Sequence, residues 1–259
     1  MTGFSYSITA LTGVPAVKPG DDLARAALDA MAASGLAFAH GDVLVCAQKI
    51  VSKAEGRQVA LDSVTPGPRA LELAAETGKD ARLVELILSE AQEVVRTRPN
   101  LIVVRHRLGL VLANAGIDQS NLGAGEGYGE GPQALLLPLD PDASAAQLRA
   151  ALHAATGQQV AVLVIDSLGR AWRMGTTGTA IGVAGMPALL DLRGRPDLNG
   201  RLLESSELGL ADELAAAASL AMGQASEGRP RVLVRGLPVM GEPGSAADLI
   251  RPLQMDLFR

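Results

Sequence analysis

Short apolar runs rich in β-branched residues alternate along this chain with longer segments whose apolar residues recur at helical spacing. The clearest run, VAVLVI at residues 160–165, predicts a buried strand. Similar runs within residues 41–57 and 230–237 predict two more strands. Because the apolar content comes mainly from Ala, Leu and Val, these segments predict a well-packed α/β (mixed α+β) interior.

The longer segments predict helices with recognisable ends. Asp21 or Asp22 can cap an amphipathic helix that ends near Gly35. Further helices are predicted over residues 68–78, 79–95 and 209–223, and after a cap at Asp142 or Ser144.

A β-hairpin and a glycine-rich segment follow the second of these helices. The arms of the hairpin are residues 101–104 and 108–112, with His106 expected to be exposed at its tip. Residues 122–132, LGAGEGYGEGP, match neither the P-loop nor the dinucleotide pattern. We therefore expect a flexible loop there, acting as a lid, in place of a phosphate cradle.

Composition narrows the classes of function. The 259 residues include 23 basic and 28 acidic side chains, and the net charge of −5 argues against broad binding to nucleic acid. Cys46 is the only cysteine, which excludes an internal disulfide and a thiolate metal cluster. No leader and no membrane-spanning run is evident, so we expect a soluble, cytoplasmic protein that does not bind membranes.

Two carboxylates follow apolar strands. Asp166 and Ser167 come directly after residues 160–165, and Asp118 lies in a polar turn after the hairpin. Two such carboxylates suit a divalent cation that keeps water and a substrate phosphate as its other ligands. The alternative is that Asp166 caps a turn. His40 and His153 have no second histidine at ligand spacing, so a zinc site is not expected.

Basic residues lie near both carboxylates. Arg170 and Arg173 suit a phosphate or carboxylate, because the planar guanidinium offers paired donors; ordinary surface ion pairs are the alternative. Lys49 and Lys53 are four residues apart and would share one face of a helix, where they could clamp an anion. The alternative for the lysines is a solvated basic turn paired with Glu55.

Several segments together resemble the GTP-dependent ligases that add L-glutamate to coenzyme F420-0. They occur in the same order over nearly the whole chain: TGVP at residues 12–15, GDVLV…KIVSKAEGR at 41–57, NAGIDQSN at 114–121, LLLPLDPDASA at 135–145, IDSLGRAWRMGTTGTAIG at 165–182, LADELAAAASLAMG at 210–223 and VLVRGL at 232–237. The combination of NAGID-x-SN, D-[ST]-x-GR and VSKAEGR is specific to this family, although no single piece is.

The resemblance implies a two-domain α/β fold in an intertwined homodimer, with residues 1–259 forming one catalytic unit of the stand-alone type. It implies that GTP phosphorylates the terminal carboxylate of F420-0, that L-glutamate attacks the acyl phosphate, and that further glutamates are added through γ-linkages. The implied cofactors are GTP as co-substrate and Mg²⁺ or Mn²⁺, with K⁺ as a further candidate.

The resemblance also assigns roles to individual residues. Asp118 and Asp166 match ligands of a first metal, and Ser167 and Gln224 match positions of a second, with Asp118, Asp166 and Lys53 as the catalytic set. Gln224 stands where the family has a glutamate, which puts that ligand in doubt. Arg170 and Arg173 are our own candidates for contacts with F420-0. The expected nucleotide contacts are Thr12, Gly13, Val14, Pro15, Gln48, Lys49, Lys53, Asn121, Met222, Gly223, Gln224, Ala225, Ser226, Glu227, Gly228 and Arg229.

Two other functions remain open at this point. One is a related nucleotide-dependent ligase with a changed acceptor or amino acid. The other is a non-catalytic nucleotide-binding relative, for which Gln224 is the one favourable feature, whereas Asp118, Asp166 and Lys53 speak against it.

Overall fold

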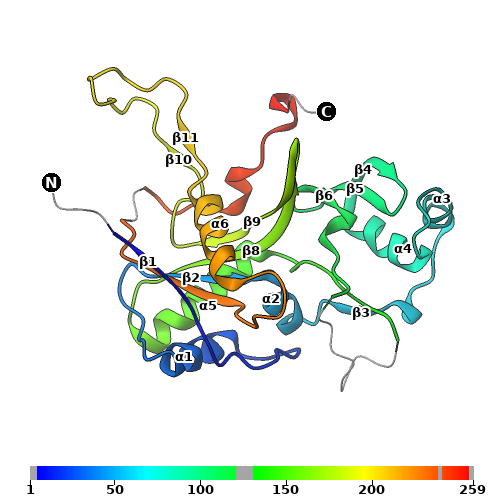
Figure 1. Ribbon diagram of the computed structural model, residues 1–259, viewed down its shortest axis with the longest axis horizontal. Coiled ribbons are helices and arrows are strands. Elements are labelled where there is room, and N and C mark those ends of the chain that lie inside the picture. Colours follow the sequence, from blue (N-terminus) through cyan, green and yellow to red (C-terminus); the bar gives the residue numbers. More distant parts are fainter. Residues whose placement is uncertain (1–4, 121–130, 239–240, 257–259) are drawn as a thin grey trace.

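The computed structural model describes residues 5–120, 131–238 and 241–256. Its centre is a five-stranded sheet in the order β1-β12-β2-β8-β9, in which only the pair β2–β8 is parallel (Figure 1). The predicted strands are confirmed, but β8 continues past residue 165 into a long hairpin with β9. The strands are β1 (Ser7–Ala10), β2 (Val43–Ala47), β8 (Ala161–Arg170), β9 (Arg173–Ala184) and β12 (Arg231–Arg235).

Helices cover both faces of this sheet. Leu44 and Val162 point toward α1 (Leu23–Ala33), α2 (Gln48–Ala54) and α5 (Pro141–Thr156). Val43 and Leu163, one residue along in each strand, point toward α6 (Leu210–Met222) on the other face. Because both sides are buried, the strands read as unbroken apolar runs. None of the described helices has both the length and the apolar character that crossing a bilayer requires.

A second group of elements has its own apolar core and lies to the right of the sheet in Figure 1. It comprises β3 (Gln58–Ala60), α3 (Pro68–Thr77), α4 (Ala81–Glu90), β4 (Ala91–Arg98), β5 (Leu101–His106), β6 (Val111–Ala113) and β7 (Gln133–Leu135). The remaining elements are β10 (Leu190–Asp191), β11 (Glu207–Leu208), and the 3-10 turns η1 (Leu61–Ser63), η2 (Asn114–Gly116), η3 (Ala246–Leu249) and η4 (Leu253–Met255). The mixed α/β class is confirmed, whereas the two-domain division and the homodimer stay predictions.

Three local predictions need correction. The helix expected over residues 79–95 ends at Glu90, because the following segment pairs with β5 as strand β4. His106 is fully buried, not exposed. The cap of α5 is Asp140, while Asp142 accepts the backbone N–H groups of Val183 and Ala246. The Asp22 cap of α1 is confirmed.

Strand β9 lies so close to two helices that glycine is required at two of its positions. A Cβ on Gly178 would overlap the backbone oxygen of Ala215 in α6, and one on Gly182 would overlap that of Pro141 in α5. A shift in register between Val164 and Ile165 turns the strand between these glycines, so the two close contacts fall on opposite faces.

Glu90, at the end of α4, is a buried carboxylate that ties the second group of elements to the rest of the fold. Arg57 Nη2 and Arg107 Nε donate to it over 2.7 and 2.9 Å, and His106 Nε2 lies 3.3 Å away. Both arginines also donate to carbonyl oxygens of residues 137–139, the segment that leads into α5. Burial alone would raise the pKa of Glu90, but the hydrogen bonds from His106 and the arginines lower it to about 2.

This depressed pKa makes the contribution of Glu90 to stability dependent on pH. We expect Glu90→Gln to lower the free energy of unfolding at pH 7 by about 3 kcal/mol, since the pKa falls from 4.5 to about 2. The contribution is complete above the unfolded-state pKa of 4.5 and is lost as the pH falls toward about 2. Urea unfolding between pH 7 and pH 2 measures it. Exposed Glu72→Gln is the control, and a difference that stays constant with pH would contradict the assignment.

Candidate functional site

A cavity of about 710 Å³ lies where the parallel strands β2 and β8 end, and we call it the pocket. The carboxyl ends of adjacent parallel strands are where α/β sheets place ligands, because both connections leave the same edge. Segments far apart in sequence contribute to its wall. They are residues 14–17, the first turns of α2, Asp118 and Ser120, the end of the buried part of β8, Thr176 of β9, Ser219 of α6, and residues 222–230.

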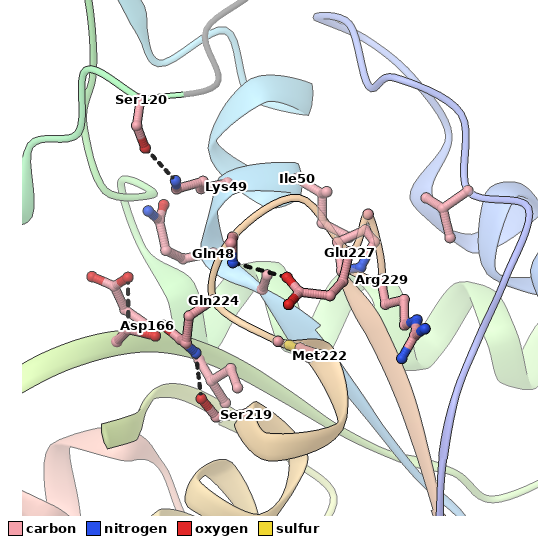
Figure 2. A pocket seen from close by; sticks show the side chains of 18 of the residues that line it. Gln48, Lys49, Ile50, Ser120, Asp166, Ser219, Met222, Gln224, Glu227 and Arg229 are labelled. Atoms are coloured by element: carbon pink, nitrogen blue, oxygen red, sulfur yellow. Dashed lines mark hydrogen bonds between the residues drawn. The ribbon is translucent and has the colours of Figure 1, made fainter. Parts of the chain in front are cut away.

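Lys49 and Asp118 form an ion pair inside the pocket. Lys49 Nζ lies 2.5 Å from Asp118 Oδ2 and donates to Ser120 Oγ over 3.0 Å (Figure 2). The Ser120 N–H donates to Asp118 Oδ1 over 2.6 Å. Burial alone would raise the pKa of Asp118, but these donors hold it below its usual value. Asp118 therefore stays ionised and is fixed in place, since its backbone also pairs with Leu135.

The pKa of Asp166 is shifted in the opposite direction. Burial, together with the nearby charge of Asp118, raises the pKa of Asp166 to about 6 against the opposing effects of the Ser167 N–H, Lys49 and Gln48. The Ser167 N–H donates to Asp166 Oδ1 over 2.8 Å. Lys49 offsets the effects of burial and of Asp118 on Asp166 only in part, although Lys53 and Arg229 also line the pocket. A cation bound beside Asp166 would favour its ionised form.

Helix α2 presents polar side chains to the pocket from its first turns. Gln48 is buried, and Ser52 Oγ donates to its side-chain oxygen over 2.8 Å. Lys53 also lines the pocket, and burial together with the charge of Lys49 lowers its pKa against the effect of Asp118. The predicted shared face of Lys49 and Lys53 is confirmed. The alternative pairing with Glu55 is wrong, since that carboxylate accepts from Leu139 N and Ser144 Oγ.

Residues 223–229 form a loop over the other side of the pocket. Gln224 Nε2 donates to Ser219 Oγ over 2.8 Å, and Ala225 N donates to Glu227 Oε2 over 2.8 Å (Figure 2). The Ala225 N–H holds the pKa of Glu227 below its usual value. Gly223 has φ 79 and ψ 174, a conformation open almost only to glycine, and a Cβ there would overlap the Glu227 side chain. The loop thus has a fixed conformation over the pocket.

The pocket gathers most, but not all, of the predicted site residues. It is lined by Val14, Pro15, Gln48, Lys49, Lys53, Asp118, Asp166, Ser167 and every residue from Met222 to Arg229. Thr12 and Gly13 are not among the lining residues, and Asn121 lies outside the described residues. Arg170 and Arg173 lie at the exposed end of the β8–β9 hairpin, away from the pocket lining.

Three polar lining residues were not predicted: Ser120, Thr176 and Ser219. Ser120 lies within the NAGIDQSN segment, so its proximity to Asp118 in sequence was an available signal. Ser219 is an isolated hydroxyl in an alanine-rich helix, and only the packing of α6 on β9 brings it to the pocket.

The donors in the pocket fit a hard divalent cation. Within the described part of the chain, no three His, Cys, Asp or Glu side chains gather at one point. Asp118 and Asp166 supply two carboxylates, and Ser167 supplies a hydroxyl in the same wall. Mg²⁺ and Mn²⁺ accept few protein oxygens when water and phosphate complete their coordination, so this donor set suits them. Gln224 is a weaker donor than the carboxylates, because its amide oxygen carries no net charge.

Comparisons with known proteins agree on one family. A family profile described as F420-0:Gamma-glutamyl ligase matches residues 13–236. The chain is 45% identical over 255 residues to the coenzyme F420:L-glutamate ligase of Methanothermobacter thermautotrophicus, covering 98% of both chains. It is 46% identical to that of Methanopyrus kandleri, covering 94% of this chain and 93% of the relative. For the Archaeoglobus fulgidus ligase the identity is 44%, over 95% and 94%. The matched region contains the whole wall of the pocket.

The two glycines of the pocket loop provide a matched test of its conformation. Gly223→Ala should lower the free energy of unfolding by about 2 kcal/mol, because it combines a strained backbone with displacement of Glu227. Gly228→Ala, also at positive φ but facing open space, should cost about 1 kcal/mol. Urea unfolding measures both, and amide exchange should speed up at Ala225 only in the first variant. Equal effects of the two variants would argue against the Glu227 contact.

Proposed function

The chain belongs to the F420-0:gamma-glutamyl ligase family, and from this membership we propose that it joins L-glutamate to coenzyme F420-0 at the expense of GTP. The γ-phosphate of GTP is transferred to the terminal carboxylate of F420-0, which gives GDP and an acyl phosphate. The amine of glutamate then attacks the acyl carbon, phosphate leaves, and an amide bond forms. The observation that carries this proposal is the pairing of two carboxylates with two lysines at the carboxyl ends of β2 and β8.

The pocket residues have different roles in this reaction. Residues 14–17 and 223–229 both line the cavity, and they hold the nucleotide. Lys49 and Lys53 neutralise its phosphates, since two ammonium groups on one helix face are placed for adjacent anions. Lys49 moves from Asp118 to the phosphate when the nucleotide enters. Catalysis then depends on positioning and on charge neutralisation, as no nucleophilic Ser–His or Cys–His set is involved.

Asp118 and Asp166 would hold Mg²⁺ or Mn²⁺, with the Ser167 hydroxyl beside them. Such a cation neutralises the charge that develops on the oxygens of the transferred phosphoryl group. Gln48 and the Ser167 N–H orient the Asp166 carboxylate, and Ser120 orients that of Asp118. The raised pKa of Asp166 supports this role, because a carboxylate that is costly to ionise beside Asp118 gains most from an added cation.

Further parts of the proposal follow from the resemblance. They are the γ-linked addition of further glutamates, a contribution from K⁺, and an intertwined homodimer of two-domain subunits. From the resemblance we also propose that the nucleotide site prefers guanine to adenine.

The first test is mass spectrometry of F420-0 incubated with the purified protein, GTP, L-glutamate and Mg²⁺ or Mn²⁺. We expect products heavier by one or more glutamyl units and one GDP for each glutamyl unit added. GTP bound in a metal-dependent way without product would mean that the acceptor or amino acid differs. Absence of both binding and product would overturn the proposal.

The two aspartates are tested by separate Asn substitutions. Asp118→Asn and Asp166→Asn should each lower kcat by about 100-fold or more while the protein stays folded, because each removes a charged ligand of the cation that would neutralise the phosphoryl group. Calorimetry should show that Mg²⁺ no longer strengthens GTP binding in either variant. Asp29→Asn, at an exposed position of α1, serves as the matched control. Near-normal rates in both pocket variants would exclude the metal assignment.

A further inference from the structure

The β8–β9 hairpin continues outward from the pocket as a two-stranded ribbon. Asp166 and Ser167 of β8 and Thr176 of β9 line the pocket. Beyond them the strands project away from the sheet (Figure 1) and end in a turn formed by Ala171 and Trp172. This ribbon is therefore a direct structural link between the reacting centre and an exposed tip.

Two arginines face each other at this tip. Arg170 and Arg173 are direct partners in the β8–β9 register and both are exposed. Like charges directly opposite each other on a hairpin are destabilising. Among the described residues, no acidic side chain forms an ion pair with either arginine, so the surface-pair interpretation finds no support. An anion bound between the two guanidinium groups would compensate this repulsion, and guanidinium is well suited to a phosphate.

Trp172 lies between these arginines in sequence, and both its exposure and its backbone conformation are energetically unfavourable. Its side chain is 85% exposed, and its backbone has φ 63, a left-handed conformation that bulky residues rarely adopt. Such strain costs about 1–3 kcal/mol and typically persists at functional sites. Met174, at 95% exposure, adds apolar surface next to it. An indole with an adjacent thioether and two cations suits a flat aromatic ligand that carries an anionic group.

We propose that this tip binds the acceptor coenzyme, with the deazaflavin ring against Trp172 and the phosphodiester between Arg170 and Arg173. The proposal rests on the function proposed above and deepens it. From Asp166 to Arg170 the strand rises about 13 Å, at ~3.3 Å per residue. An elongated acceptor that lies along the ribbon thus places its terminal carboxylate beside Asp166 while its ring stays at the tip. When the acceptor lies along the ribbon, most of the cavity remains available for GTP and glutamate.

Intrinsic fluorescence tests the contact directly, because Trp172 is the only tryptophan of the chain. Without ligand, we expect the emission of a solvent-exposed indole. F420-0 should quench it in a saturable way, whereas GTP or L-glutamate alone should not. If the wild type forms glutamylated product while its emission does not respond to F420-0, the proposal is overturned and the proposed function stands.

Steady-state kinetics separate acceptor binding from chemistry. Arg170→Gln and Arg173→Gln should each raise the KM for F420-0 about tenfold, as expected for loss of one charge-assisted contact, with the KM for GTP unchanged. Arg25→Gln, an exposed arginine on α1, is the matched control and should change neither constant. Unaltered KM values for F420-0 in both tip variants would overturn the assignment.

Trp172→Gly distinguishes a ligand contact from a structural role. Glycine accepts the left-handed conformation without strain, so the thermal midpoint should not fall, whereas the KM for F420-0 should rise about tenfold. If a second copy of the chain covered the tip instead, the free protein would show a buried-indole emission that changes on dilution, and this variant would dissociate the dimer. That outcome would reassign the tip to an interface. No product and no F420-0 binding in the wild type would remove the proposed function and this inference together.

Discussion

The parallel pairing of β2 with β8 is the constraint on which the pocket depends. It brings the start of α2 and the point where β8 leaves the core to the same edge of the sheet, which places Lys49 opposite Asp166. The close packing of β9 against α5 and α6 keeps this edge in position, because Gly178 and Gly182 allow contact between backbones with no side chain between them. Ser219 and the loop after α6 reach the pocket only because α6 lies so close.

Two carboxylates, Glu90 and Asp166, have pKa values shifted in opposite directions. Glu90 is surrounded by two arginines and a histidine, and its pKa is lowered to about 2. Burial, together with the charge of Asp118, raises the pKa of Asp166 to about 6. A charge that its neighbours fully balance holds elements together, whereas a charge that they balance incompletely is prepared for a ligand. The contrast distinguishes the pocket from the buried ion-pair cluster around Glu90.

The sequence predicted those features that depend on neighbours along the chain. The Asp22 cap, the strand at residues 160–165 and the α6 helix have local signals and were correct. The segment 91–95 looked helical because it continues an amphipathic pattern, yet pairing with β5 decides its conformation. The burial of His106 was also missed, because it arises from tertiary packing beside Glu90, which is distant in sequence. For the pocket, most residues followed from the family's motifs, but the order of strands that assembles them did not.

The place of β12 in the sheet has a consequence for synthesis of the protein. Within the described residues, this strand follows all the other strands of the sheet in sequence, yet it lies between β1 and β2 in the sheet order. A nascent chain that has emerged only as far as α6 therefore lacks an inner strand, and β1 has no partner to pair with. The central sheet can close only after β12 has left the ribosome. Formation of this sheet therefore follows synthesis of α6, and β1 cannot pair within the sheet until β12 is available.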